Sequence, residues 1–129
     1  MDFGPYEDGG PFLDLVGPVY VKGEGEGRTF GFRIAEQHLN VAGVAQGGLL
    51  ATVADHSLGQ AVRAGRDDDE RSATVSLTTD YLAPGELGDW VESKTRVERV
   101  AGRMAFADCS LRVGDREIVR ARAVFAVVS

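Results

Sequence analysis

The chain has little cysteine and no long apolar run. Cys109 is its one cysteine in 129 residues, which excludes an internal disulfide and a multi-cysteine metal site and is typical of a reducing cytoplasm. No run of about eighteen apolar residues occurs. The first residues also lack the cationic and apolar segments of a secretory signal. We therefore expect a cytoplasmic protein with no metal site and no membrane association.

Positive charge is scarce as well. There are 14 Lys and Arg residues against 20 Asp and Glu residues, so the net charge is −6. Nucleic acid requires a basic surface for its phosphates, so we expect no nucleic-acid partner. An apolar content of 43% over this length predicts one domain with one core. Residues 1–28, rich in glycine and proline, are predicted to form an N-terminal arm with a short helix or turn, and residues 29–129 to form the domain.

The apolar pattern changes from a helical to a strand period along the chain. A strand is predicted at 29–34 and a helix from about 46 to 63, and the acidic run 67–70 reads as a solvated turn. From residue 71 onward a period of two predicts four antiparallel strands, separated by turns at 84–85, 101–102 and 114–115. This order predicts an α+β architecture, with one long central helix wrapped by a curved antiparallel sheet of about five to six strands.

Three motifs carry a resemblance to a known family. They are Asn40-x-x-Gly43-x-x-Gln46-Gly47-Gly48 followed by Ala54-Asp55, then Tyr81-Leu-Ala-Pro84-x-x-x-Gly88-Asp89, and last Gly102-Arg103-Met-Ala105-Phe106. The span from about 29 to 128 resembles the PaaI-type hotdog acyl-CoA thioesterases. The resemblance implies an enzyme that hydrolyses an aromatic or medium-chain acyl-CoA to free acid and CoA without a cofactor. It also implies a homodimer or homotetramer with active sites at the subunit interface.

Asp55 does not contribute to the stability of the predicted helix, so its presence there indicates another role. Asp is a poor helix former, and a carboxylate on an apolar helix face is costly unless it is hydrogen-bonded, hydrated or used. The pair Gly47-Gly48 at the helix start leaves free N–H groups at the positive end of the helix dipole, where a carbonyl oxygen would be polarised. Asp55 would then act on the thioester as a general base or as a nucleophile, and the sequence leaves both roles open.

The resemblance assigns further roles around this pair. Asn40 would position the carbonyl or the water, and Gln46 stands where many relatives have His. A hydroxyl from the partner's strand would assist, and Thr74 matches it best, with Ser76 next. The substrate-binding residues implied by position in the motifs are Gly48, His38 and Ser76, and the arginines Arg99 and Arg103 beside the turn at 101–102 would meet the phosphates of CoA.

Other interpretations remain open. Asp55 could have a structural role, such as capping a buried amide or pairing with an Arg of the partner subunit. His56, a quarter turn from Asp55, is predicted to be a surface or interface residue. A non-catalytic acyl-CoA binding protein stays possible because Gln46 cannot change charge near neutral pH. A dehydratase or hydratase acting on acyl thioesters is a further alternative, although His38 lacks the motif that surrounds the His of those enzymes.

Overall fold

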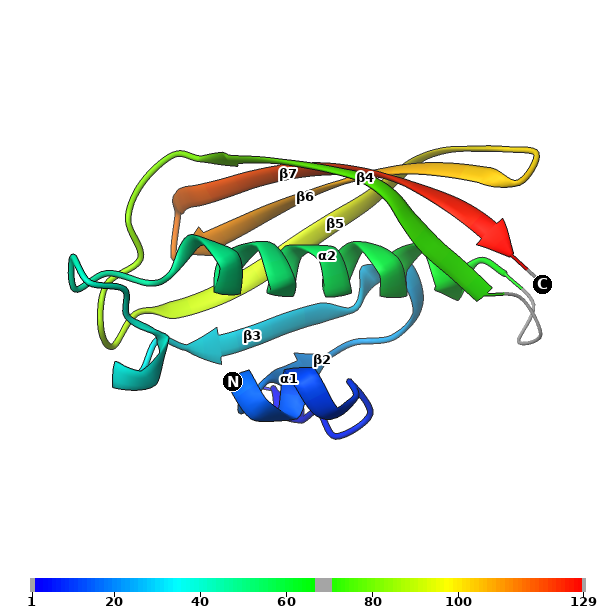
Figure 1. Ribbon diagram of the computed structural model, residues 1–129. Coiled ribbons are helices and arrows are strands. Elements are labelled where there is room, and N and C mark those ends of the chain that lie inside the picture. Colours follow the sequence, from blue (N-terminus) through cyan, green and yellow to red (C-terminus); the bar gives the residue numbers. More distant parts are fainter. Residues whose placement is uncertain (1, 67–70, 129) are drawn as a thin grey trace.

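One long helix lies across a single antiparallel sheet (Figure 1). The computed structural model describes residues 2–66 and 71–128, so the predicted turn at 67–70 lies outside the described residues. Its helices are α1 (Pro11–Val16) and α2 (Gly47–Ala64), with short 3-10 turns at Gly25–Gly27 and Glu36–His38. Its strands are β1 (Gly4–Pro5), β2 (Tyr20–Lys22), β3 (Thr29–Arg33), β4 (Arg71–Tyr81), β5 (Trp90–Ala101), β6 (Met104–Val113) and β7 (Arg116–Val128).

The sheet confirms the predicted fold class and exceeds the predicted strand count. Over the described residues it has seven strands in the order β1-β2-β3-β5-β6-β7-β4, and neighbouring strands are antiparallel. The additional strands come from residues 1–28, where β2 pairs with β3 and β1 pairs with β2. At the predicted turns, Gly102 and Gly114 have φ of 60° and 59°, which only glycine adopts at little cost. Helix α2 ends at Gly65, as expected from the pattern.

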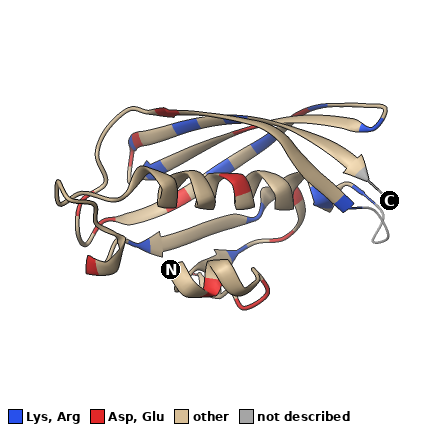
Figure 2. Ribbon diagram, viewed as in Figure 1, with Lys and Arg blue, Asp and Glu red and all other residues tan. Residues whose placement is uncertain are grey.

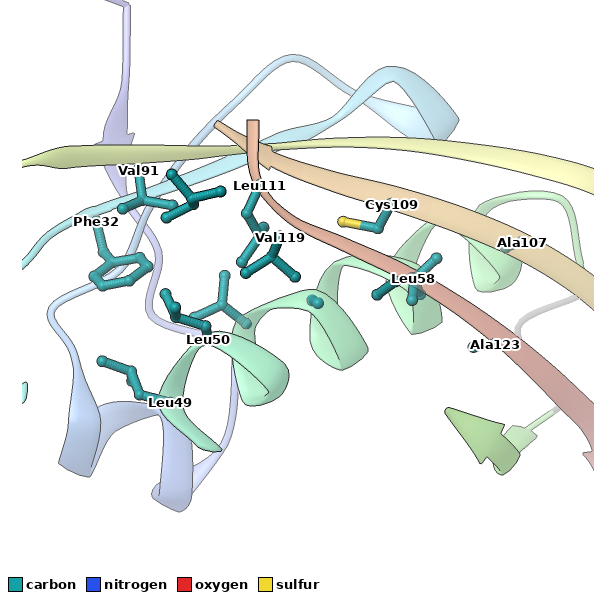
Figure 3. Close-up of a cluster of buried hydrophobic side chains, with 14 of the residues drawn as sticks. Phe32, Leu49, Leu50, Leu58, Val91, Ala107, Cys109, Leu111, Val119 and Ala123 are labelled. Atoms are coloured by element: carbon teal, nitrogen blue, oxygen red, sulfur yellow. The ribbon is translucent and has the colours of Figure 1, made fainter. Parts of the chain in front are cut away.

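The core lies between α2 and the concave face of the sheet (Figure 3). Leu58 of α2 and Ala107 of β6 are fully buried there, and Ala123 of β7 is almost so. Small alanines on the sheet let the helix approach closely, while Leu58 gains about 1.5–3 kcal/mol from complete burial. Alternate residues of the last two strands face this core, and the buried ones include Ala105, Ala107, Cys109, Leu111, Val119, Ala121, Ala123, Phe125 and Val127.

The N-terminal arm has a small core of its own. Tyr6, Leu13 and Val19 pack on Phe30 of β3, and all four side chains are buried. Helix α1 is the short helix expected in this segment, and the arm lies against β3 rather than extending away from the domain (Figure 1). Within the described residues, no helix combines the length and apolarity needed to span a membrane.

Candidate active site

Asp55 is hydrogen-bonded to the neighbouring strand. It lies midway along α2 and is partly exposed, although Ala54 and Leu58 beside it are fully buried. The hydroxyl Oγ1 of Thr74 on β4 donates to Asp55 Oδ1 at 2.8 Å. A carboxylate can accept about four hydrogen bonds, so this contact fixes one oxygen and leaves acceptor capacity for a water or substrate.

A depression of about 610 Å³ opens beside this pair. Its size lies within the range of small-molecule sites, which is about 300–1,000 Å³. Helix α2 and strand β4 form most of its wall, and the lining residues include Asp55, His56, Gln60, Arg63, Arg71 and Thr74. The carboxylate thus faces an open space with polar walls.

The start of α2 is held by a tyrosine. The hydroxyl of Tyr81, at the end of β4, donates to the carbonyl oxygen of Gly47 at 2.8 Å. A Cβ atom on Gly47 would lie 3.2 Å from Tyr81 Cζ, so a larger residue would require the ring to shift by a few tenths of an ångström. A Cβ on Gly48 would meet no atom within 4 Å. Tyr81 was not predicted as a site residue, although it opens the second sequence motif.

Gly47 and Asp55 of one chain lie too far apart to act on the same carbonyl group. They are eight residues apart on α2, which at 1.5 Å per residue separates them by about 12 Å along the axis. One chain alone therefore does not bring both groups to one thioester. Thr74 bonds to Asp55 of its own chain, a contact that was not predicted from the sequence. Ser76 is exposed and lies just after an irregularity in the β4–β7 pairing.

The loop before α2 positions the helix start. The side-chain oxygen Oδ1 of Asn40 accepts hydrogen bonds from the N–H groups of Ala42 at 2.9 Å and Val44 at 3.3 Å. This bonding is typical of Asn in turns and leaves its amide NH₂ group as the part that can reach a substrate. Gln46 is the exposed N-cap of α2, and its N–H donates to the carbonyl of His38 at 2.8 Å.

His38 has a structural role in this loop. It is 4% exposed, and its Nδ1 accepts a hydrogen bond from the N–H of Ala35 at 2.9 Å. The other ring nitrogen, Nε2, therefore carries the proton and donates to the carbonyl of Val16 at 2.6 Å. Both nitrogens are occupied by backbone groups, so the structure does not bring His38 to the site as a substrate-binding residue.

His56 is half-buried beneath the N-terminal arm and also lines the depression beside Asp55. Its Nε2 is 2.8 Å from the hydroxyl of Tyr6, and its ring makes an edge contact with Phe30. Burial lowers the pKa of His56, while the charge of Asp55 acts in the opposite direction. The helix period placed His56 correctly beside Asp55. Its burial could not be read from that period, because it depends on the arm folding back.

The basic residues near Asp55 are not the predicted ones. Arg63 and Arg71 line the depression, and Figure 2 shows basic residues at the end of α2 and the start of β4. Arg103 instead donates from Nη2 to the carbonyl of Val127 at 2.9 Å, and Arg99 is exposed near the end of β5. Neither Arg99 nor Arg103 lines the depression that holds Asp55. Among the described residues, no group of three His, Cys, Asp or Glu side chains is placed to hold a metal ion.

Comparison with known proteins identifies the family. The model of the Thioesterase superfamily matches residues 42–120, which include Asp55, Thr74 and Gly47. The Pseudomonas aeruginosa protein named "Putative esterase PA0474" is 39% identical over 124 residues, covering 95% of this chain and 92% of that protein.

Solved structures show the same fold. The conserved protein PA5202 from Pseudomonas aeruginosa superposes with a TM-score of 0.86 at 23% identity, covering 92% of this chain and 94% of that one. The E. coli PaaI protein, from the phenylacetic acid degradation operon, gives 0.79 at 17% identity, covering 86% and 80%. The chain therefore belongs to the Thioesterase superfamily and is a thioester hydrolase with the hotdog fold, as the sequence motifs predict.

Proposed function

We propose that the protein is an acyl-CoA thioesterase that acts on an aromatic or medium-chain acyl group, in the cytoplasm and without a cofactor. The observation that carries the proposal is the Thr74–Asp55 hydrogen bond at the wall of an open depression. A carboxylate oriented by a hydroxyl and open to a ligand is the arrangement that a general base or nucleophile needs. The family match supports the reaction class, and the choice of acyl group follows the resemblance of the sequence motifs to the PaaI-type enzymes.

The complete site is proposed to form between two copies of the chain. Strand β4 runs antiparallel to α2, so Thr74 meets Asp55 near one end of the strand and Tyr81 meets Gly47 at the other. In the described part of the sheet, β4 pairs with β7 alone, and its other edge is open to a further strand. Two copies pairing antiparallel through β4, about a two-fold axis near Leu77, would place Thr74 of one copy near the end of the partner's β4. That arrangement brings Gly47 of the partner subunit toward Asp55.

The reaction then divides between the two subunits. The N–H of the partner's Gly47 polarises the thioester carbonyl at the positive end of its helix and stabilises the oxyanion. Asp55 either removes a proton from a water that attacks the carbonyl carbon, or attacks it directly to form a mixed anhydride that water then hydrolyses. In both routes the carbon–sulfur bond breaks and the CoA thiolate leaves. The proton given up by the attacking water passes through Asp55 to that thiolate, so the products are the free acid and the CoA thiol, and Asp55 is again ionised. Thr74 holds Asp55 in position, and Gln46 contributes only hydrogen bonds.

Thiol release from a panel of acyl-CoAs tests the proposal. We expect the wild type to hydrolyse phenylacetyl-, benzoyl- or medium-chain acyl-CoA, and Asp55→Asn to lose about a hundredfold or more in rate, the scale of a lost base or nucleophile. The released thiol can be followed with a thiol reagent, because Cys109 is buried and burial raises its pKa to about 12. Full activity in Asp55→Asn would contradict the role of the carboxylate.

The same assay separates the proposal from the alternatives that the sequence left open, the first of which is a non-catalytic acyl-CoA binding protein with Gln46 at the helix start. It predicts stable binding of acyl-CoA at pH 7 with no thiol release from any thioester in the panel. A dehydratase or hydratase would instead change the enoyl absorbance while the thioester stays intact.

A further inference from the structure

A second depression adjoins the one that holds Asp55. It lies between the C-terminal part of α2 and the N-terminal arm, has a volume of about 490 Å³, and is lined by Arg28, Arg63 and Arg66. Gln60 and Arg63 line both depressions, so the two form neighbouring parts of one surface. Arg71 adds another guanidinium on the side of Asp55. This concentration of positive charge is unusual in a chain whose net charge is −6.

Arg28 is held in place by aromatic rings. Its guanidinium carbon lies 5.4 Å from the ring centroid of Tyr6 and 5.6 Å from that of Phe30. Its Nη1 donates to Oε1 of Gln60 on α2 at 3.4 Å. A guanidinium fixed by stacking retains further N–H donors in a planar fork, which suits the oxygen atoms of a phosphate.

The charges around these arginines favour an anion. Within the described residues, neither Arg28 nor Arg63 forms an ion pair with a carboxylate. Among the described residues that line the second depression, Asp8 is acidic and Arg28, Arg63 and Arg66 are basic. An arginine in the last turn of a helix interacts favourably with the negative end of the helix dipole, and this effect can explain why Arg63 stands at its position. That effect does not explain Arg28, which comes from a different element.

The distance between Asp55 and Arg63 suits a substrate whose charged end lies far from its reacting carbonyl group. Arg63 follows Asp55 by eight residues, which is about 12 Å along α2, and its own side chain extends this reach. We propose that the second depression binds the phosphate-bearing nucleotide end of a CoA thioester, with Arg28 and Arg63 as its anion-binding side chains. This inference rests on the proposed function and deepens it, because it makes the enzyme prefer CoA thioesters over the same acyl group on a thiol without phosphates.

The test compares two substrates that share one acyl group. One is the acyl-CoA, and the other is the N-acetylcysteamine thioester, which keeps the reacting bond and lacks the phosphates. We expect Arg63→Gln to raise KM for acyl-CoA about fivefold or more, and to leave kcat/KM for the truncated thioester within about twofold, since only the phosphate contact is removed. Arg63→Lys should recover part of the affinity, and Lys94→Gln, which removes an exposed charge from β5, serves as the control.

Several outcomes would overturn the inference while leaving the thioesterase intact. The inference is wrong if Arg63→Gln lowers kcat/KM equally for both substrates. It is also wrong if KM for acyl-CoA is unchanged in both Arg63→Gln and Arg28→Gln. A rise in KM in Arg99→Gln alone would move the phosphate site to the β5–β6 turn. If no thioester is hydrolysed, the proposed function fails. Calorimetric titration with adenosine 3′,5′-bisphosphate then tests the anion site separately: binding that is lost in Arg63→Gln supports it, and absence of binding to the wild type refutes it.

Discussion

The two glycines at the start of α2 have different tasks, and alanine substitution separates them. In Gly47→Ala the new Cβ would lie 3.2 Å from Tyr81 Cζ and 3.3 Å from its hydroxyl, so the ring must move and the hydrogen bond to Gly47 is disturbed. We expect a loss of about 1–3 kcal/mol of stability, typical of overpacking, and reduced thiol release. Gly48→Ala meets open space, and we expect equal or slightly higher stability because alanine favours the helix by up to about 1 kcal/mol.

Thermal unfolding and thiol release of the two variants measure this difference. Tyr81→Phe is the matched control, since it keeps the ring and removes only the hydroxyl that bonds to Gly47. Equal destabilisation by Gly47→Ala and Gly48→Ala would show that the contact with Tyr81 does not fix the helix start.

At the scale of elements, the N-terminal arm is coupled to α2 through Tyr6 and His56. Burial lowers the pKa of His56 below its ordinary value, with the charge of Asp55 opposing this effect and that of Arg28 adding to it. The unfolded chain therefore binds a proton at this site more readily than the folded one. The stabilising contribution is complete above the unfolded pKa of about 6.5 and is lost as the pH falls toward the lower folded pKa.

Chemical denaturation between pH 7.5 and 5.5, a window of about one unit on either side of that pKa, tests this coupling. We expect the free energy of unfolding to fall with acidification in the wild type and to fall less in His56→Gln, which has no charge to gain. If the free energy of unfolding falls equally steeply with pH in the wild type and in His56→Gln, the acid sensitivity comes from other titratable groups. Tyr6→Phe removes the hydroxyl near His56 Nε2 and should loosen the arm at neutral pH.

Long elements could be predicted from the sequence, and short ones could not. Helix α2 and strands β4 to β7 show many repeats of their period, so their positions and inward faces follow from the residue pattern. Strands β1 and β2 have two and three residues, too few to show a period. Their pairing with β3 depends on the small core around Phe30, which joins distant parts of the chain. The sheet is therefore wider than the sequence predicts.

The candidate active site, too, could be predicted only in part from the sequence. Asp55 and Thr74 could each be predicted as site residues from the motifs, but the hydrogen bond between them within one chain could not. The positions of charged side chains could not, because they depend on which elements end side by side. Arg63 and Arg28 are 35 positions apart in the sequence and meet only after the arm has packed on α2.

For the whole molecule, the open edge of β4 predicts that activity requires dimerisation. Thr78 is exposed and faces Arg122 of β7 across the strand pair, and it lies close to the proposed two-fold axis. In Thr78→Glu the new carboxylate gains a basic neighbour within its own chain, so the monomer fold is kept. In the dimer it would lie diagonally across the paired strands from its own copy, close enough for the two carboxylates to repel each other. We expect the dissociation constant of the dimer to rise about tenfold or more, which corresponds to about 1.4 kcal/mol.

Sedimentation velocity and thiol release over a range of protein concentrations test this prediction together. Because the partner's Gly47 is proposed to complete the site around Asp55, activity should fall in parallel with the dimer fraction and recover at high concentration. Thr78→Gln, of similar size and without the charge, should remain dimeric and active. A Thr78→Glu monomer that hydrolyses acyl-CoA at the full rate would mean that one chain contains the whole site, and the carbonyl would then have to be polarised by a group other than the N–H of Gly47.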